Sequence, residues 1–191
     1  MNEYVTYCKY VFLIPGNTFS GDFLRSWSRT LDKLNELDIS YRYFIDYQPN
    51  IALIRNRLLG TNAAGQDFST IPFAGFVECE RVVFIDSDMV WTTEQLEKLL
   101  TSPYDVVTGV YSFRDNKRAV LTTGNKFDML SHEEVLSKQE PFEVTMCGLG
   151  FFSCTMEVLK SITFPWFDTG FNLDNTNVPN PLPVDHFYAE D

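Results

Sequence analysis

The sequence predicts an α/β fold: a mostly parallel sheet flanked by helices, followed by a mixed, loop-rich C-terminal half. Three observations support this prediction. Short apolar runs alternate with segments of helical periodicity over residues 1–112, as in repeated β-α units. Residues 113–191 are irregular in pattern, and prolines gather near their end. The chain of 191 residues is long enough for one domain with a buried core.

The expected helices have recognisable starts. Ser20 is a good N-cap residue type, and Thr92 with Gln95 three residues later forms a capping-box pattern. Each precedes apolar residues at helical spacing. The expected strands cover 10–14, 41–45, 82–85 and 104–110, with others near 120 and 144; further helices are expected over 51–59 and 156–162.

The charge balance limits the classes of partner. The chain has 26 acidic and 15 basic residues, a formal net charge of -11. Such a surface repels nucleic-acid phosphates and anionic lipid, so we expect no nucleic-acid partner. An acidic protein that binds a phosphorylated ligand needs a local cation, either basic side chains or a metal ion.

The sequence predicts a cytoplasmic protein without a membrane span. The N-terminus lacks the basic start and apolar run of a signal peptide, and no apolar run reaches the ~18 residues that a span needs. Because the chain stops directly after an aromatic-rich segment, we also expect it to be a fragment of a longer protein. Reduced thiols are expected at the four cysteines, with a disulfide pair as the alternative: Cys8, Cys79, Cys147 and Cys154.

Asp86-Ser87-Asp88 directly follows the apolar run Val82–Ile85. In α/β sheets, ligands bind outside the carboxyl ends of the strands. In extended backbone, the two aspartates would point the same way and repel each other unless a cation lies between or beyond them. A hard divalent ion, with phosphate oxygens as its remaining ligands, resolves this repulsion. The pattern therefore predicts a metal site that joins an acidic protein to a diphosphate.

Several segments resemble, in order and spacing, those of glycosyltransferases with the GT-A fold, in particular relatives of glycosyltransferase family 2. Residues 83–91 resemble the family's DxD segment, 54–58 (IRNRL) the helix before it, and 107–111 (VTGVY) the strand after it. Residues 147–152 (CGLGFF) resemble the segment beside the acceptor, and Glu190-Asp191 the late acidic pair. The resemblance implies one Rossmann-like domain over 1–191, with a nucleotide-binding half (1–112) and an acceptor-shaping half (113–191).

The resemblance also implies a reaction. A hexosyl or deoxyhexosyl group would move from a nucleotide-diphosphate sugar, expected to be a UDP-sugar, to a hydroxyl of a glycan or other acceptor. Asp191, beside Glu190, would be the general base, which implies inversion. Asp88 would bind Mn²⁺ or Mg²⁺ directly, Asp86 the ribose or the metal's water shell, and His186 would complete the metal's ligands.

The remaining expected donor contacts come from the first half of the chain. Arg55 would offer a bidentate contact to a phosphate. The expected donor-binding residues, each with an ordinary turn or solvated helix face as its alternative, are Pro15, Gly16, Asp46, Arg55, Asn56, Asp86 and Ser87.

On the acceptor side, Gly148 and Gly150 would let a sugar approach the backbone closely, and a plain loop is the alternative. An aromatic group would offer a stacking surface for a sugar, with core packing as its alternative. Its members are Trp166, Phe167 and Phe171.

Two other functions fit part of the pattern. Residues 84–90 also match the opening motif of haloacid-dehalogenase-like phosphatases, in which Asp86 would be a nucleophile and Asp88 an acid/base. That motif usually lies near the N-terminus, whereas two β-α units precede it here. A non-catalytic nucleotide-sugar-binding module would keep both aspartates and would not need Asp191 as a base. The sequence leaves the donor sugar, the acceptor and the oligomeric state open.

Overall fold

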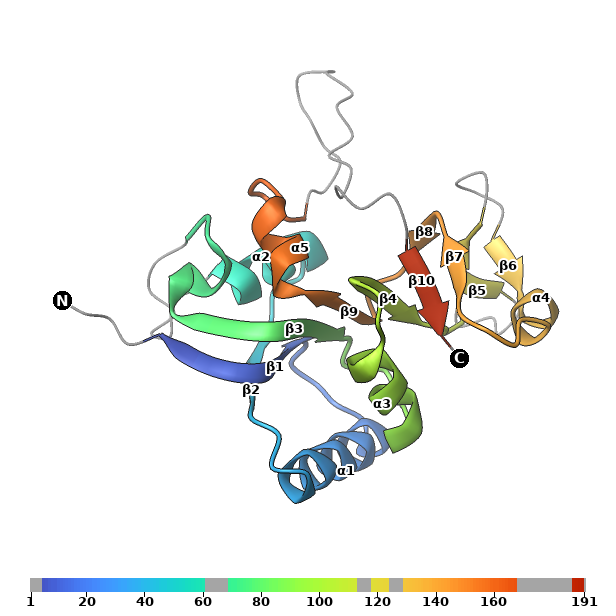
Figure 1. The fold of residues 1–191 in the computed structure, drawn as a ribbon, viewed down its shortest axis with the longest axis horizontal. Helices are drawn as coiled ribbons and strands as arrows, with labels where there is room; N and C mark the ends of the chain where they lie inside the picture. The colour runs from blue at the N-terminus through green and yellow to red at the C-terminus, as the bar shows by residue number, and fades with distance from the viewer. Residues whose placement is uncertain (1–4, 61–68, 113–117, 124–128, 168–186, 191) are drawn as a thin grey trace, which may run out of the picture.

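In the computed structural model, which describes residues 5–60, 69–112, 118–123, 129–167 and the backbone of 187–190, a mixed seven-stranded sheet forms the centre of the molecule (Figure 1). The strand order is β2-β1-β3-β9-β4-β10-β7, and a separate antiparallel sheet has the order β6-β5-β8. The bounds in the main sheet are β1 Thr6–Pro15, β2 Tyr41–Asp46, β3 Val77–Ile85, β4 Val106–Gly109, β7 Phe142–Val144, β9 Phe151–Thr155 and β10 Phe187–Glu190.

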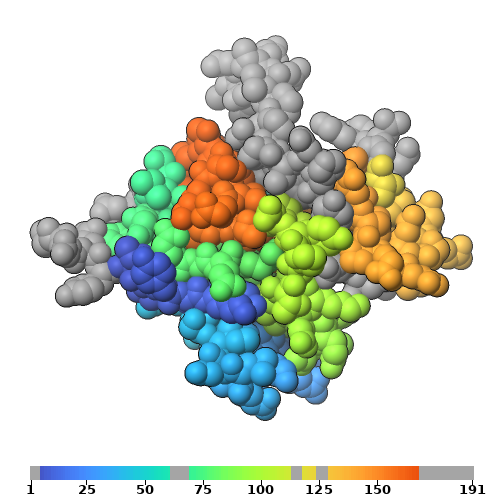
Figure 2. Space-filling model, viewed as in Figure 1, coloured from blue at the N-terminus to red at the C-terminus, as the bar shows by residue number. Residues whose placement is uncertain are grey.

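The other elements connect and cover these strands. The small sheet contains β5 Arg118–Thr122, β6 Met129–Ser131 and β8 Met146–Cys147. The helices are α1 Gly21–Glu36, α2 Ile51–Gly60, α3 Thr93–Thr101, α4 His132–Leu136 and α5 Met156–Ser161, with a 3₁₀ turn η1 at Pro72–Gly75. The small sheet lies in the yellow and lighter orange part at one side of the molecule in Figure 2, whereas the darker orange part near the centre contains α5.

Strand direction decides which ends share an edge of the sheet. β1 pairs in parallel with β2 and β3, and β4 pairs in parallel with β10. β9 lies antiparallel between β3 and β4, and β7 is antiparallel to β10. Consequently β1, β2, β3, β4 and β10 run in one direction, and their carboxyl ends lie at the same edge. The predicted mostly parallel sheet flanked by helices is present, but it is mixed, because β9 comes from the second half of the chain and lies antiparallel between β3 and β4.

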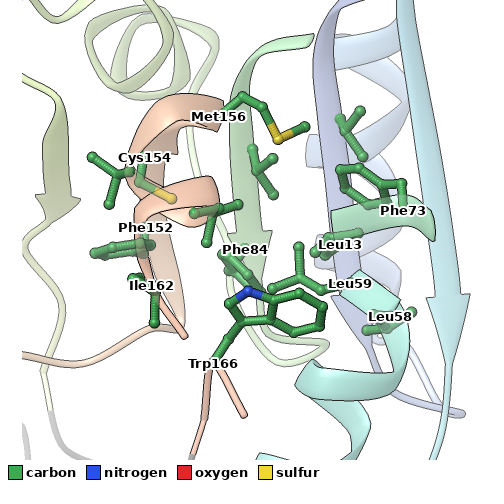
Figure 3. Packing of buried hydrophobic residues seen from close by; sticks show 14 of the residues in the cluster. Leu13, Leu58, Leu59, Phe73, Phe84, Phe152, Cys154, Met156, Ile162 and Trp166 are labelled. Carbon is green, nitrogen blue, oxygen red and sulfur yellow. The ribbon is translucent and has the colours of Figure 1, made fainter. Parts of the chain in front are cut away.

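Both faces of the main sheet are buried along the C-terminal parts of β1 and β3, and side chains of β1 alternate between them. Val11 and Leu13 belong to the cluster under α2 and α5, whereas Phe12 and Ile14 belong to the cluster under α1 and α3. Figure 3 shows the first cluster, in which Phe84 lies among side chains from both covering helices. This burial on both faces explains why residues 11–14 of β1 and 82–85 of β3 are apolar at every position.

The predicted helix starts at 20 and 92 are confirmed. The Ser20 hydroxyl accepts a hydrogen bond from the Phe23 amide (3.0 Å). Thr92 and Gln95 form both bonds of a capping box, at 3.2 and 2.9 Å. Within the described residues, the structure contains no helix long and apolar enough to cross a membrane.

Candidate functional site

Three predicted residues meet at the carboxyl ends of β1 and β2. Pro15 is buried at the end of β1, in register with Asp46 at the end of β2. The amide of Gly16 donates to the Asp46 carbonyl (2.9 Å). The Asp46 carboxylate accepts from its neighbour Tyr47 (2.7 Å) and pairs with Arg57 (2.9 Å). The predicted edge site is therefore assembled by main-chain contacts between neighbouring strands.

Asp86-Ser87-Asp88 lies in a turn, so the expected extended backbone is wrong. The Met89 amide donates to the Asp86 carbonyl (3.0 Å), which closes the turn just beyond β3. Ser87 packs directly on Gly16: a Cβ added to Gly16 would lie 2.4 Å from the Ser87 Cβ atom. Only glycine leaves room for this contact, so the loop after β1 and the acidic turn hold each other in place.

Arg55 of α2 pairs with Asp86. Its Nη2 donates to both carboxylate oxygens of Asp86, at 2.9 and 3.2 Å, and the two side chains are 11% and 30% exposed. The Nε of Arg55 is buried and has no hydrogen-bond partner among the described residues. Burial raises the pKa of Asp86 above its usual range, Arg55 counteracts this, and the nearby Asp88 carboxylate raises the pKa further.

Asp88 differs from Asp86 in its surroundings. Its side chain is exposed, whereas that of Asp86 is half-buried. Within the described ranges, no three histidine, cysteine or acidic side chains form a preformed metal cage. His186 and Asp191 lie outside the described residues, and of Glu190 only the backbone is described, as the last residue of β10.

Tyr111 is a site residue that sequence reasoning did not single out. Its hydroxyl accepts a hydrogen bond from the Gly150 amide (2.9 Å), and the Gly150 carbonyl accepts from the Asp86 amide (2.8 Å). Burial raises the pKa of Tyr111 to about 12, and the nearby Asp86 carboxylate adds to the shift. Two sequence features could have indicated this contact: a tyrosine two residues after Gly109, and a Gly-x-Gly segment later in the chain.

The space above Gly148 and Gly150 is filled by the Tyr111 side chain. A Cβ at Gly148 would lie 1.9 Å from the Tyr111 hydroxyl, and one at Gly150 would lie 2.9 Å from it. The Gly150 Cβ would also lie 3.1 Å from Oδ2 of Asp86. The glycines thus accommodate a protein side chain here, which accounts for them without a sugar.

Asn56 holds the chain after α5 in place. Its side-chain nitrogen donates to the Ala52 carbonyl (3.0 Å) and the Phe167 carbonyl (2.6 Å), and its oxygen accepts from the Phe167 amide (3.0 Å). Both amide hydrogens are therefore used within the protein. Trp166 is buried in the core beside Gly60 of α2, which agrees with core packing, the alternative to a sugar-stacking role. Phe171 lies outside the described residues.

Helix α1 anchors the far side of the acidic turn through Trp91. The Trp91 indole donates to the Thr30 hydroxyl (3.0 Å), and its carbonyl accepts from the Ser26 hydroxyl (2.8 Å). All three residues are buried. The segment Asp86–Trp91 is thus fixed at both ends, by Gly150 and by α1.

Comparison with known proteins finds a structure with a similar fold. No protein-family model and no curated protein matches the chain. The fold is similar to the crystal structure of A197 from STIV, with a TM-score of 0.52 and 20% sequence identity. The match covers 95% of this chain and 81% of A197. At this level of identity the likeness concerns the fold alone.

Proposed function

We propose that this chain is a metal-dependent glycosyltransferase of GT-A type, which moves a sugar from a nucleotide-diphosphate sugar to an acceptor hydroxyl. The observation that carries the proposal is the unequal pair at the end of β3. Asp86 is half-buried and paired with Arg55, and Asp88 beside it is exposed. This arrangement leaves one carboxylate accessible to a cation at the ligand-binding edge of an α/β sheet.

The residues present fit a divalent ion that arrives with its phosphate ligand. Magnesium and similar ions commonly take one or two carboxylates and fill the remaining positions with water and substrate phosphates. Asp88 would be the direct ligand, and Mn²⁺ or Mg²⁺ would offset charge on the departing diphosphate. Among the described residues, the Nε–H of Arg55 has no acceptor, so the guanidinium that pairs with Asp86 retains a hydrogen-bond donor, and this supports a role for it near a phosphate.

The other proposed contacts follow from the edge geometry. Pro15, Gly16 and Asp46 would line the nucleoside part, with a uracil base as the expected one. Ser87 would hold the turn against Gly16. Tyr111 would hold the Gly150 peptide and, through it, the Asp86 backbone.

The proposed general base is Asp191, with Glu190 beside it. Support comes from the direction of β10, because its carboxyl end lies at the same edge as that of β3. In register, Glu190 is the partner of Gly109, two residues before Tyr111. A carboxylate that follows this strand would deprotonate the acceptor hydroxyl, and inversion of the sugar would follow.

A phosphatase built on the same motif is less well supported. It would need Asp86 as a free nucleophile, and both oxygens of Asp86 accept from Arg55. The two reactions also release different products. A transferase releases nucleoside diphosphate from a nucleotide sugar, whereas a phosphatase releases inorganic phosphate.

Calorimetric titration with UDP tests the proposal, with and without Mn²⁺. We expect Mn²⁺ to strengthen UDP binding at least about tenfold, a difference of about 1.4 kcal/mol. Asp88→Asn should abolish the effect of Mn²⁺, whereas Glu36→Gln, at an exposed carboxylate on α1, should not change it. Turnover is then measured as released nucleoside diphosphate across a panel of nucleotide sugars. Equal UDP affinity with and without Mn²⁺ in the wild type would contradict the metal-dependent reading.

A further inference from the structure

Two cysteines that lie far apart in the sequence are direct neighbours at the opposite edge of the main sheet. Cys8 of β1 and Cys79 of β3 are partners in the parallel register of these strands. Neighbouring strands lie about 4.7–4.9 Å apart. Disulfides join Cα atoms that are about 4.4–6.8 Å apart. The two backbones therefore meet the spacing that a disulfide requires.

Their side chains share a face of the sheet, and both residues are partly exposed. Both pack against the hydrophobic cluster under α2 and α5. Both residues are also among those that line a surface hollow of about 640 Å³ at this end of the strands. The other two cysteines differ. Cys154 is buried and in register with Val82 and Val106, and Cys147 is in register with Leu121 of the small sheet.

We propose that Cys8 and Cys79 form a dithiol site that closes to a cross-strand disulfide on reaction with a small-molecule disulfide such as oxidised glutathione. All four cysteines are free thiols in the structure. This site is independent of the proposed glycosyl transfer, because it lies at the amino ends of β1 and β3, away from the acidic turn.

The chemistry is thiol–disulfide exchange in two steps. One protein thiolate attacks a sulfur of oxidised glutathione, which forms a mixed disulfide and releases one glutathione thiolate. The second protein thiolate attacks the protein sulfur of the mixed disulfide, which forms the Cys8–Cys79 bond and releases the second glutathione. The protein loses two electrons, glutathione disulfide gains them, and the two thiol protons end on the two released thiols.

The groups around Cys8 and Cys79 determine the pH at which the exchange reaction proceeds. Burial raises the pKa of both thiols, and the guanidinium of Arg42 partly counteracts this at Cys8. The thiolate is the attacking species, so the reaction should proceed in alkaline buffer. At Cys79, the neighbouring Cys8, Cys154 and Glu78 raise the pKa further and Lys160 opposes them, whereas at Cys8 the neighbouring Arg42 lowers it, so Cys8 is the expected first nucleophile.

The test uses the reduced full chain, incubated with oxidised glutathione in alkaline buffer and then treated with a thiol-alkylating reagent. We expect a loss of two hydrogen atoms per chain and a proteolytic peptide pair that joins Cys8 to Cys79. Cys8→Ser and Cys79→Ser should each prevent the link, and the matched control Cys147→Ser should retain it. Recovery of both thiols in alkylated form, mixed disulfides only, or a link from Cys79 to Cys154 would overturn the proposal.

A second measurement does not depend on whether the serine variants fold. The disulfide would close a long loop between β1 and β3, so the oxidised wild type should unfold at a higher denaturant concentration than the reduced protein. Dithiothreitol should reverse the shift. If the oxidised protein contains the Cys8–Cys79 disulfide but unfolds at the same or a lower denaturant concentration, the bond strains the sheet. That result would contradict the proposal that the two strands have the spacing of a disulfide.

Discussion

The contact between Tyr111 and Gly150 gives a sharp prediction. Gly150→Ala places a Cβ atom 2.9 Å from the Tyr111 hydroxyl oxygen, 3.0 Å from Cζ of the ring and 3.1 Å from Oδ2 of Asp86. Comfortable contacts are about 3.5–4.0 Å. Gly150 does not have a left-handed φ, so the backbone itself accepts alanine. Overpacking of this kind costs about 1–3 kcal/mol, which is the expected loss in the free energy of unfolding.

A double-mutant cycle can show whether contact with the Tyr111 side chain causes the loss of stability in Gly150→Ala. Tyr111→Ala removes two of the three close contacts, so Gly150→Ala in that background should cost less than about 1 kcal/mol, with a coupling of about 1–2 kcal/mol. Urea denaturation of the four proteins measures this. Gly21→Ala is the control, since its Cβ would approach nothing closer than Nη1 of Arg25 at 3.7 Å. An equal cost of Gly150→Ala in both backgrounds would refute the steric argument.

Three other substitutions test separate parts of the site. Asp86 has a folded-state pKa above its unfolded value of about 3.9, so its contribution to stability is complete below that pH and is lost as pH rises through the folded pKa. Asp86→Asn should therefore gain stability relative to the wild type across this window, as measured by urea denaturation at several pH values; a constant difference would contradict the shift. Thr30→Val leaves the buried Trp91 indole without its acceptor and should cost about 1–3 kcal/mol, whereas Thr30→Ser should cost less. Asn56→Ala should destabilise the fold by about 2 kcal/mol because two hydrogen bonds between the Asn56 side chain and the Phe167 backbone are lost, and UDP affinity should stay unchanged in titration calorimetry. A large loss of UDP affinity in a stably folded Asn56→Ala protein would instead favour the predicted donor contact.

Local signals were sufficient for much of the fold. Caps at Ser20 and Thr92 and the apolar runs of β1, β2 and β3 depend on residues close in sequence, and the structure has these elements with longer strands than expected. Strand β9 was not predicted, because its five residues follow a glycine segment that resembled a loop. Its place between β3 and β4 depends on pairing with residues 44 and 72 positions earlier, as Thr108↔Phe152 and Val82↔Cys154 show.

In the candidate site, too, the features that depend on nearby residues could be predicted, whereas those that depend on distant contacts could not. The edge position of Asp86 followed from the strand before it, so it could be predicted. The role of Asn56 could not, because its partner Phe167 is 111 residues away and the contact exists only in the folded chain. The filling of the space over Gly148 and Gly150 by Tyr111 is likewise a property of packing, whereas the sequence showed only which residues lacked a side chain.

The position of β9 has a consequence for how the chain acquires its structure. During synthesis, β3 and β4 emerge well before residues 151–155, and neither can complete its hydrogen bonds on that side until β9 has been made. In a nascent chain ending near residue 112, β3 and β4 therefore remain open on the side that β9 covers later, and late, non-local pairing of this kind is slow. Such edges favour association with other chains. We expect the segment 1–112 expressed alone to aggregate, and the full chain to fold only after β9 has been inserted.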